Sequence, residues 1–215
     1  MRVAVLRQDP RLVPTRLYLI RHGQVADGHT DRYHGHNDVD LSDVGLRQYE
    51  NLAAYLQPVP LSAVYSSDLR RTRIGAEMLA AGRGLTPTPC PEFRELCFGV
   101  WEGLTLTEIK ERYPQELEAR FRDLANFRIP GGESLTDVQA RVLPKLRELL
   151  RRHPGQSLAL VAHAGVNRVI LCDALNLPLE HLFRLDQAYG CLNIIDYFPD
   201  FTLVRLINGG VNGAG

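Results

Sequence analysis

Two short apolar segments of this 215-residue chain run directly into a histidine. Residues 17–20 lead to Arg21 and His22, and residues 157–162 lead to His163. Runs of this length are typical of buried strands. The carboxyl ends of parallel strands meet at one edge of a sheet, where ligands bind. A histidine there can act as a nucleophile, and an arginine beside it offers forked donors that match phosphate oxygens. The pattern predicts phosphoryl chemistry at that edge.

An Arg-His-Gly tripeptide is common, and a packed or solvated histidine is its plainer interpretation, so other motifs must decide. Residues 63–66 form a further strand-like run, followed by a polar helix start that ends in Arg71. By position this segment brings a second arginine to the same edge. Taken alone, the arginines around it would be interpreted as a solvated helix face.

A candidate general acid lies in the aromatic run 93–103, where Glu95 and Glu102 stand seven residues apart. A carboxylate packed against Phe98 and Trp101 would be desolvated, which suits a group that must deliver a proton. The alternative is a buried turn anchored by the only tryptophan of the chain.

Together these motifs resemble the histidine phosphatase superfamily, the phosphoglycerate-mutase-like enzymes, over residues 17–165. The matching blocks are Arg-His-Gly at 21–23, a loop and helix start at 35–45, Ser-Ser-x-Leu-x-Arg at 66–71, Glu-x-x-x-Gly-x-Trp-Glu-Gly at 95–103 and Gly-Gly-Glu-Ser at 131–134. Five ordered blocks in fitting contexts are far more specific than any one of them.

The resemblance implies three catalytic residues, with His22 as nucleophile, Glu95 as proton donor and His163 as a second catalytic histidine. Glu102 would be a structural hydrogen-bonding residue. Phosphate binding is expected from Arg21, Arg71, Asn37 and Gly165. Gly28 stands where many relatives carry a phosphate-contacting asparagine, so Asn37 is expected to supply that contact from the next loop. Thr72 stands where alanine is usual.

The implied reaction is hydrolysis of a small-molecule phosphate monoester through a phosphohistidine, without a metal or other cofactor. The short segment at 104–130 favours hydrolysis over mutase action. The whole pattern, with Asp186-Gln187 ahead of Cys191-Leu192-Asn193, looks most like the α-ribazole phosphatases of cobalamin synthesis. Broad-specificity phosphatases share nearly all of it. A cofactor-dependent phosphoglycerate mutase and an inactive binding module are the further alternatives.

A histidine-rich loop offers a different interpretation, because His29, His34 and His36 could bind zinc. A third and fourth ligand with convincing spacing are not evident, so no metal site is expected.

The amino-acid composition indicates which kinds of partner and which cellular compartment to expect. Positive and negative side chains number 25 each, so no overall field would attract nucleic acid or an anionic membrane. Four scattered cysteines without a Cys-x-x-Cys pair fit a reducing cytoplasm. The apolar run at 3–6 is too short for a signal-peptide core. We therefore expect a cytoplasmic enzyme, and a homodimer is compatible with the sequence.

Alternating strands and amphipathic helices predict a three-layer α/β/α sandwich with a mainly parallel sheet and a small helical cap. Strands are expected at 17–20, 63–66, 157–162, 191–198 and 201–207, with at most a short one within 82–92. Helices are expected at 42–56, 68–81, 105–112, 114–127, 135–152, 166–175 and 179–183. The domain should span 16–207, between an N-terminal arm at 1–15 and a flexible tail at 208–215.

The cap at about 104–130 is expected to cover the phosphate site with some of its larger side chains. The candidates are Tyr113, Phe121, Arg122 and Phe127. Aromatic side chains there would favour a ring-bearing leaving group.

Overall fold

The computed structural model describes residues 13–210, and its strands form one sheet. The strands are β1 (Thr15–Arg21), β2 (Leu61–Ser66), β3 (Thr88–Pro89), β4 (Ser157–Ala162), β5 (Leu192–Tyr197) and β6 (Thr202–Gly209). Their order is β3-β2-β4-β1-β5-β6. The pairings among β1, β2, β3 and β4 are parallel, and those that add β5 and β6 are antiparallel. The mainly parallel sheet is therefore confirmed.

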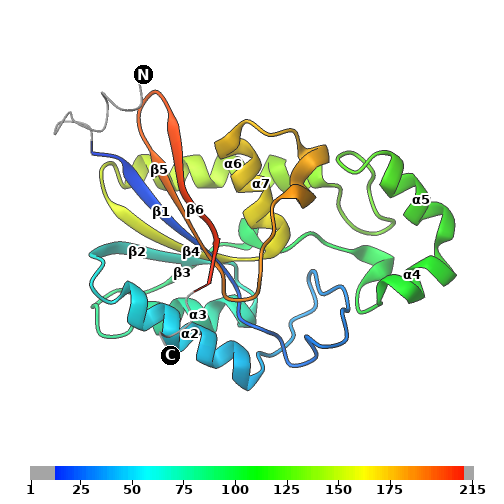
Figure 1. The fold of residues 1–215 in the computed structure, drawn as a ribbon, viewed down its shortest axis with the longest axis horizontal. Coiled ribbons are helices and arrows are strands. Elements are labelled where there is room, and N and C mark those ends of the chain that lie inside the picture. Colours follow the sequence, from blue (N-terminus) through cyan, green and yellow to red (C-terminus); the bar gives the residue numbers. More distant parts are fainter. Residues whose placement is uncertain (1–12, 211–215) are drawn as a thin grey trace.

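Helices cover both faces of the sheet (Figure 1). On one face lie α2 (Asp43–Leu56) and α3 (Arg70–Ala80), and on the other lie α6 (Leu135–Arg152) and α7 (Ala164–Leu175). Successive side chains of β1 point to opposite faces of the sheet, as they do in any pleated strand. Leu17 and Leu19 pack in the core on the α6 side, and Tyr18 and Ile20 pack in the core on the α2 side. The three-layer sandwich is confirmed.

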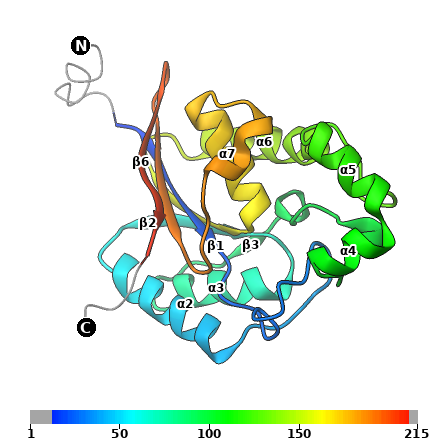
Figure 2. The ribbon, with the colours of Figure 1, turned by 45° about the vertical axis from the view of Figure 1, so that its right-hand side comes forward.

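A small helical cap stands beyond the end of β1 (Figure 2). It contains α4 (Leu106–Arg112) and α5 (Pro114–Arg122), after the short 3₁₀ turns η1 (Pro91–Phe93) and η2 (Gly99–Trp101). Ile109 and Leu117 of the cap belong to the same buried cluster as Leu17 and Leu19 of the sheet. The cap therefore shares its core with the sandwich.

Two capping boxes fix helix starts where the sequence places them. Thr105 accepts from the backbone N–H of Glu108 at the start of α4, and Ser134 accepts from the backbone N–H of Asp137 at the start of α6.

The helix expected to reach residue 127 ends at Arg122 instead. Asp123 leaves the helical conformation and its carboxylate accepts from the Asn126 N–H, which turns the chain.

Other boundaries differ by a few residues. β1 begins at Thr15 and β6 extends to Gly209, so both strands reach into segments expected as arm and tail. The remainder of that arm and tail, residues 1–12 and 211–215, lies outside the described residues. The last helix expected near residue 179 is the 3₁₀ helix η3 (Leu179–Arg184). No helix within residues 13–210 has the length and apolar character needed to cross a membrane.

Candidate active site

His22 and His163 lie side by side at the carboxyl ends of two neighbouring parallel strands. Arg21 pairs with Ala162 in the register of β1 and β4, and the next residue of each strand is a histidine. The backbone N–H of His22 donates to the Ala162 carbonyl at 3.0 Å. The two ring centroids are 5.2 Å apart, with the planes inclined by 60°. The two histidines therefore lie next to one another at the edge of the sheet where the strand ends were expected to meet.

The ring of His22 is held in one tautomer. Its Nδ1 lies 2.8 Å from the carbonyl oxygen of Gly23, which can only accept, so Nδ1 carries the proton. In the neutral ring, Nε2 then carries the lone pair. Burial and the nearby charges of Arg71 and Arg21 hold the pKa of His22 well below its ordinary value. The geometry therefore presents an unprotonated, nucleophilic Nε2 at neutral pH.

His163 is fully buried and anchored by a pair of hydroxyl groups. Its Nε2 lies 2.8 Å from Ser67 Oγ, which lies 2.7 Å from Thr72 Oγ1. Thr72, at the position where alanine is usual in the family, thus extends the chain that orients this ring. Burial and the charge of Arg71 lower the pKa of His163 well below its ordinary value. Its buried Nδ1 has no hydrogen-bond partner among the described residues.

Arg21 is positioned by an aromatic ring that sequence reasoning missed. Its guanidinium lies over the Tyr189 ring, 3.8 Å from the centroid, and one of its nitrogens donates to the Gln187 carbonyl at 2.5 Å. The Tyr189 ring also lies 5.5 Å from the ring of His22. Arg21 Nε is buried and unpartnered within the described residues, which leaves one forked edge of the guanidinium for a ligand.

Arg71 is fully buried close to the histidines, but most of its donors are already engaged. One terminal nitrogen donates to the Asn37 carbonyl at 2.7 Å, and the other donates to the Gly35 carbonyl at 2.7 Å. Only Nε is unpartnered among residues 13–210. The Asn37 side chain is exposed and its amide nitrogen lies beside Gly103, so a phosphate contact from Asn37 stays a prediction. Asn37 contributes a carbonyl that holds Arg71.

Glu95 is buried at the edge of the same site. Its carboxylate accepts from the backbone N–H groups of Leu96 at 2.9 Å and Gly165 at 3.0 Å. A Cβ on Gly165 would lie 2.3 Å from a carboxylate oxygen of Glu95, so any larger residue there would displace that carboxylate. The Gly165 N–H, expected to bind phosphate, is instead used to hold the candidate acid.

The other two acids of this region have structural partners. Glu102 accepts from the backbone N–H groups of Gly35, His36 and Phe98, as expected of a structural residue. Glu133 pairs with Arg141, whose guanidinium also reaches the Glu95 carbonyl. Both carboxylates therefore fix the loops on which Glu95 sits.

Gly23 allows two backbone segments to pack directly against one another. A Cβ there would lie 2.4 Å from the carbonyl oxygen of Gly45, so the two backbones are in direct contact. This contact seats the loop after His22 on the first turn of α2.

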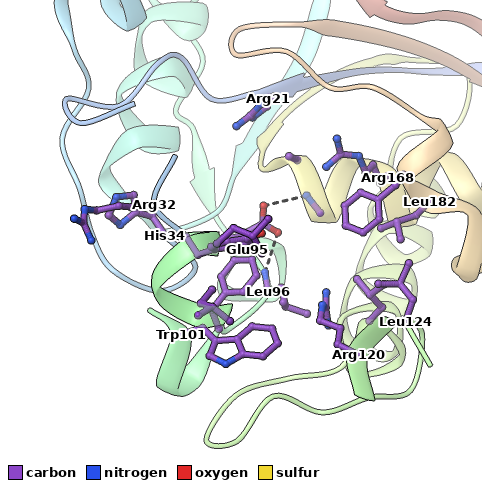
Figure 3. A pocket seen from close by; sticks show the side chains of 18 of the residues that line it. Arg21, Arg32, His34, Glu95, Leu96, Trp101, Arg120, Leu124, Arg168 and Leu182 are labelled. Carbon is purple, nitrogen blue, oxygen red and sulfur yellow. Dashed lines mark hydrogen bonds between the residues drawn. The ribbon is translucent and has the colours of Figure 1, made fainter. Parts of the chain in front are cut away.

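A cavity of about 330 Å³ opens from His22 and Glu95 toward the cap. Its walls are largely leucine and aromatic side chains, and Figure 3 shows Arg21 and Arg120 at opposite ends of it with Glu95 between them. Of the cap residues expected here, Phe121 lines the cavity, whereas Tyr113 and Phe127 pack against the core. Arg122 points away and pairs with Glu118.

Arg120 and Arg168 line the cavity and were missed by sequence reasoning. A signal for Arg120 was present, because Leu117, Arg120, Phe121 and Leu124 follow the i, i+3, i+4, i+7 spacing of an inward helix face. A charged residue on such a stripe is unusual and points to a site.

The histidine-rich loop has protein partners. His34 Nε2 lies 2.7 Å from Asp27 Oδ2, and His36 Nε2 lies 3.0 Å from the Glu95 carbonyl oxygen. Between residues 13 and 210 no group of three or more metal-ligating side chains is found.

Residues 17–209 match the family model of the histidine phosphatase superfamily (branch 1). The chain belongs to this family, and the resemblance found in its motifs is confirmed. Among curated proteins, a bifunctional protein of Mycobacterium tuberculosis is 35% identical over 92% of this chain. The chain spans only 55% of that relative's length.

Two further relatives match over most of their own length. Phosphoserine phosphatase 1 of Hydrogenobacter thermophilus is 32% identical, over 83% of this chain and 82% of its own. The crystal structure of a putative α-ribazole-5′-P phosphatase from Escherichia coli superposes with a TM-score of 0.86 at 26% identity. That match covers 94% of this chain and 100% of the other.

Proposed function

We propose that the protein is a phosphoric monoester hydrolase that works through a phosphohistidine at His22. The observation that carries the proposal is the hydrogen bond from His22 Nδ1 to the Gly23 carbonyl, which leaves Nε2 as the nucleophilic atom beside His163. Membership of the histidine phosphatase superfamily and the phosphatase names among its relatives support it.

The phosphate dianion of the substrate would bind among three side chains, each with a buried nitrogen that has no hydrogen-bond partner among the described residues. These are Arg21 Nε, Arg71 Nε and His163 Nδ1. Their donors and charges would offset the negative charge on the equatorial oxygens of the transition state, where most of the catalysis of phosphoryl transfer lies. A metal ion is not required, because two guanidinium groups supply the positive charge.

Two displacements at phosphorus complete the reaction. First, the Nε2 lone pair of His22 attacks phosphorus in line, the ester P–O bond breaks, and Glu95 gives its proton to the departing alkoxide. Glu95, now a carboxylate, then takes a proton from water, whose oxygen attacks phosphorus and displaces His22. Inorganic phosphate is released and Glu95 is protonated again. Glu95 faces the cavity in which the leaving group would sit.

Among the substrates that the names of its relatives suggest, we propose α-ribazole 5′-phosphate as the first candidate, with broad specificity as the alternative. The name of the matching E. coli structure and the largely apolar walls of the cavity support a ring-bearing leaving group. Cofactor-dependent mutase action and an inactive binding module are the remaining alternatives. A cytoplasmic location and a homodimer also stay predictions.

Quenched-flow mixing with ³²P-labelled ester tests the mechanism. Wild type should show acid-labile, base-stable label on the protein, mapped by mass spectrometry to the peptide that holds His22. His22→Ala should lose label and turnover together. Turnover without label in wild type, or label on another residue, would contradict the proposal. A panel of α-ribazole 5′-phosphate, sugar phosphates, nucleotides and 3-phosphoglycerate then ranks substrates by kcat/KM.

A further inference from the structure

The cavity has a second set of unpartnered donors at its far end. Arg120 of α5 is 8% exposed, and its Nη1 is buried without a hydrogen-bond partner among the described residues. Trp101 is 2% exposed, and its Nε1 is likewise buried and unpartnered in residues 13–210. Both side chains line the same cavity, at the end away from Arg21 (Figure 3).

Three other arginines of the described chain, of which Arg71 is buried and Arg141 and Arg168 are half-buried, show how unusual Arg120 is. Arg71 donates to backbone carbonyls, Arg141 pairs with Glu133, and Arg168 donates to the Leu185 carbonyl. Arg120 has neither kind of partner within residues 13–210. A buried cation without a counter-charge is strongly destabilising, and a buried indole N–H ordinarily finds an acceptor. A ligand in the cavity would supply what the protein lacks.

The charges around the cavity support the same conclusion. The described side chains that line it include four arginines and a single carboxylate, Glu95. Arg32 is paired with Glu108, and Glu95 is held by two backbone N–H groups. Arg21 is accounted for by the phosphate group, and Arg168, which donates to the Leu185 carbonyl, lies toward the Arg21 end of the cavity (Figure 3). The positive charge of Arg120 is left over for a second acidic group of the substrate.

We propose that Arg120 and Trp101 form a second subsite that binds a carboxylate on the leaving group. A carboxylate fits better than a second phosphate, because one guanidinium neutralises a monoanion whereas a dianion would leave charge in an apolar cavity. The substrate is therefore a phosphate ester with an apolar middle and a carboxylate at its far end. This inference rests on the proposed phosphatase activity, and it ranks α-ribazole 5′-phosphate, which has no acidic group there, behind such an ester.

A matched pair of esters tests the subsite. Wild type, Arg120→Gln and the control Arg122→Gln are assayed with 4-carboxyphenyl phosphate and with its neutral isostere 4-carbamoylphenyl phosphate. In wild type, kcat/KM should favour the carboxylate, and Arg120→Gln should reduce that preference about tenfold or more, as loss of a charged hydrogen bond does. Arg122, exposed on the same helix, should leave the preference unchanged. Differences in leaving-group acidity cancel in this ratio of ratios.

Further arms separate the outcomes. Arg120→Lys should recover part of the preference, and Trp101→Phe should lower it by a smaller factor. A bisphosphate of hydroquinone tests the second-phosphate alternative, and a wild-type preference for it over the carboxylate would overturn the choice of ligand. Equal carboxylate-to-amide ratios in wild type and Arg120→Gln, in variants with wild-type thermal stability, would overturn the subsite.

A binding measurement keeps the subsite testable if the enzyme proves inactive. Calorimetric titration with 4-carboxybenzylphosphonate and 4-carbamoylbenzylphosphonate requires no turnover. Tighter wild-type binding of the carboxylate, lost in Arg120→Gln, would support the subsite even if no ester is hydrolysed. Absence of turnover with that binding difference intact would count against the proposed function alone.

Discussion

The ring centroids of His22 and His163 lie 5.2 Å apart, and neither ring is hydrogen-bonded to a carboxylate. The partner of His22 is the Gly23 carbonyl, and that of His163 is the Ser67 hydroxyl. A carboxylate partner would stabilise a charged imidazolium, whereas a carbonyl or hydroxyl does so weakly. With two arginines nearby, both rings favour the neutral form. In the proposed mechanism, a neutral His22 attacks phosphorus from Nε2, and a neutral His163 donates from Nδ1.

The pH dependence of the free enzyme should reflect this. Since the pKa of His22 is lowered from its ordinary value near 6.5, the nucleophile remains neutral as the pH falls through 6.5. We expect kcat/KM to stay constant through that range after correction for the fraction of substrate phosphate that is in its dianionic form. A fall in kcat/KM with an apparent pKa at or above 6.5, not explained by the second ionisation of the substrate phosphate measured separately, would contradict this prediction.

Stability should also depend on His163. Its pKa is lower in the folded than in the unfolded state, so unfolding takes up a proton between the two values. The free energy of unfolding is then fully present above about pH 6.5 and decreases as the pH falls below it. His163→Asn should flatten this slope by up to about 1.4 kcal/mol per pH unit, measured by urea denaturation from pH 7.5 to 5. Identical slopes in the two proteins would rule the linkage out.

Glu95→Gln should separate two kinds of leaving group. Alkyl phosphates need protonation and should slow by about 10²- to 10⁴-fold, whereas para-nitrophenyl phosphate should slow far less. The comparison is made on one variant by the two rate ratios. Equal slowing of both substrates would shift the role to Glu102 or Glu133. Glu102→Gln should instead lower thermal stability, since that carboxylate holds three backbone N–H groups.

Gly165→Ala should act through Glu95. Its Cβ would overlap the Glu95 carboxylate, displacing the candidate acid while leaving His22 in place. We expect hydrolysis of alkyl phosphates to be lost preferentially, in the pattern of Glu95→Gln. Gly210→Ala is the matched control, because a Cβ there has no described atom within 4 Å. A Gly165→Ala enzyme that slows equally on alkyl and para-nitrophenyl phosphates would disconnect this glycine from Glu95.

Activity should survive metal removal. Arg21 and Arg71 supply the positive charge that a metal would bring, so dialysis against a chelator should leave hydrolysis of para-nitrophenyl phosphate intact. Lasting loss that only an added metal ion restores would refute this and return the loop of His29, His34 and His36 to consideration.

Sequence patterns located the parts of the site that lie on regular elements. His22 and His163 follow strands whose apolar runs are unmistakable, and parallel pairing brings the ends of such strands together. Roles that depend on long-range contacts were not accessible in this way. That Arg71 donates to the Gly35 and Asn37 carbonyls, and that the Gly165 N–H holds Glu95, depend on the path of loops distant in sequence.

The residues that line the cavity were also only partly predictable from the sequence. Arg122 was singled out from the sequence although Arg120, two positions earlier, is the arginine that points inward. Helical spacing distinguishes the two, because Arg120 lies three positions after the buried Leu117 on α5, but only once Leu117 is known to face inward.

The core shared by cap and sheet constrains how this protein can diverge. Ile109 and Leu117 are buried in one cluster with Leu17 and Leu19, so the cap is not an exchangeable cassette. Replacing it whole would expose part of the core of the sandwich and cost stability of the entire fold. Single substitutions at cavity-lining positions such as Arg120 and Phe121 would instead change the substrate contacts while leaving that shared core in place.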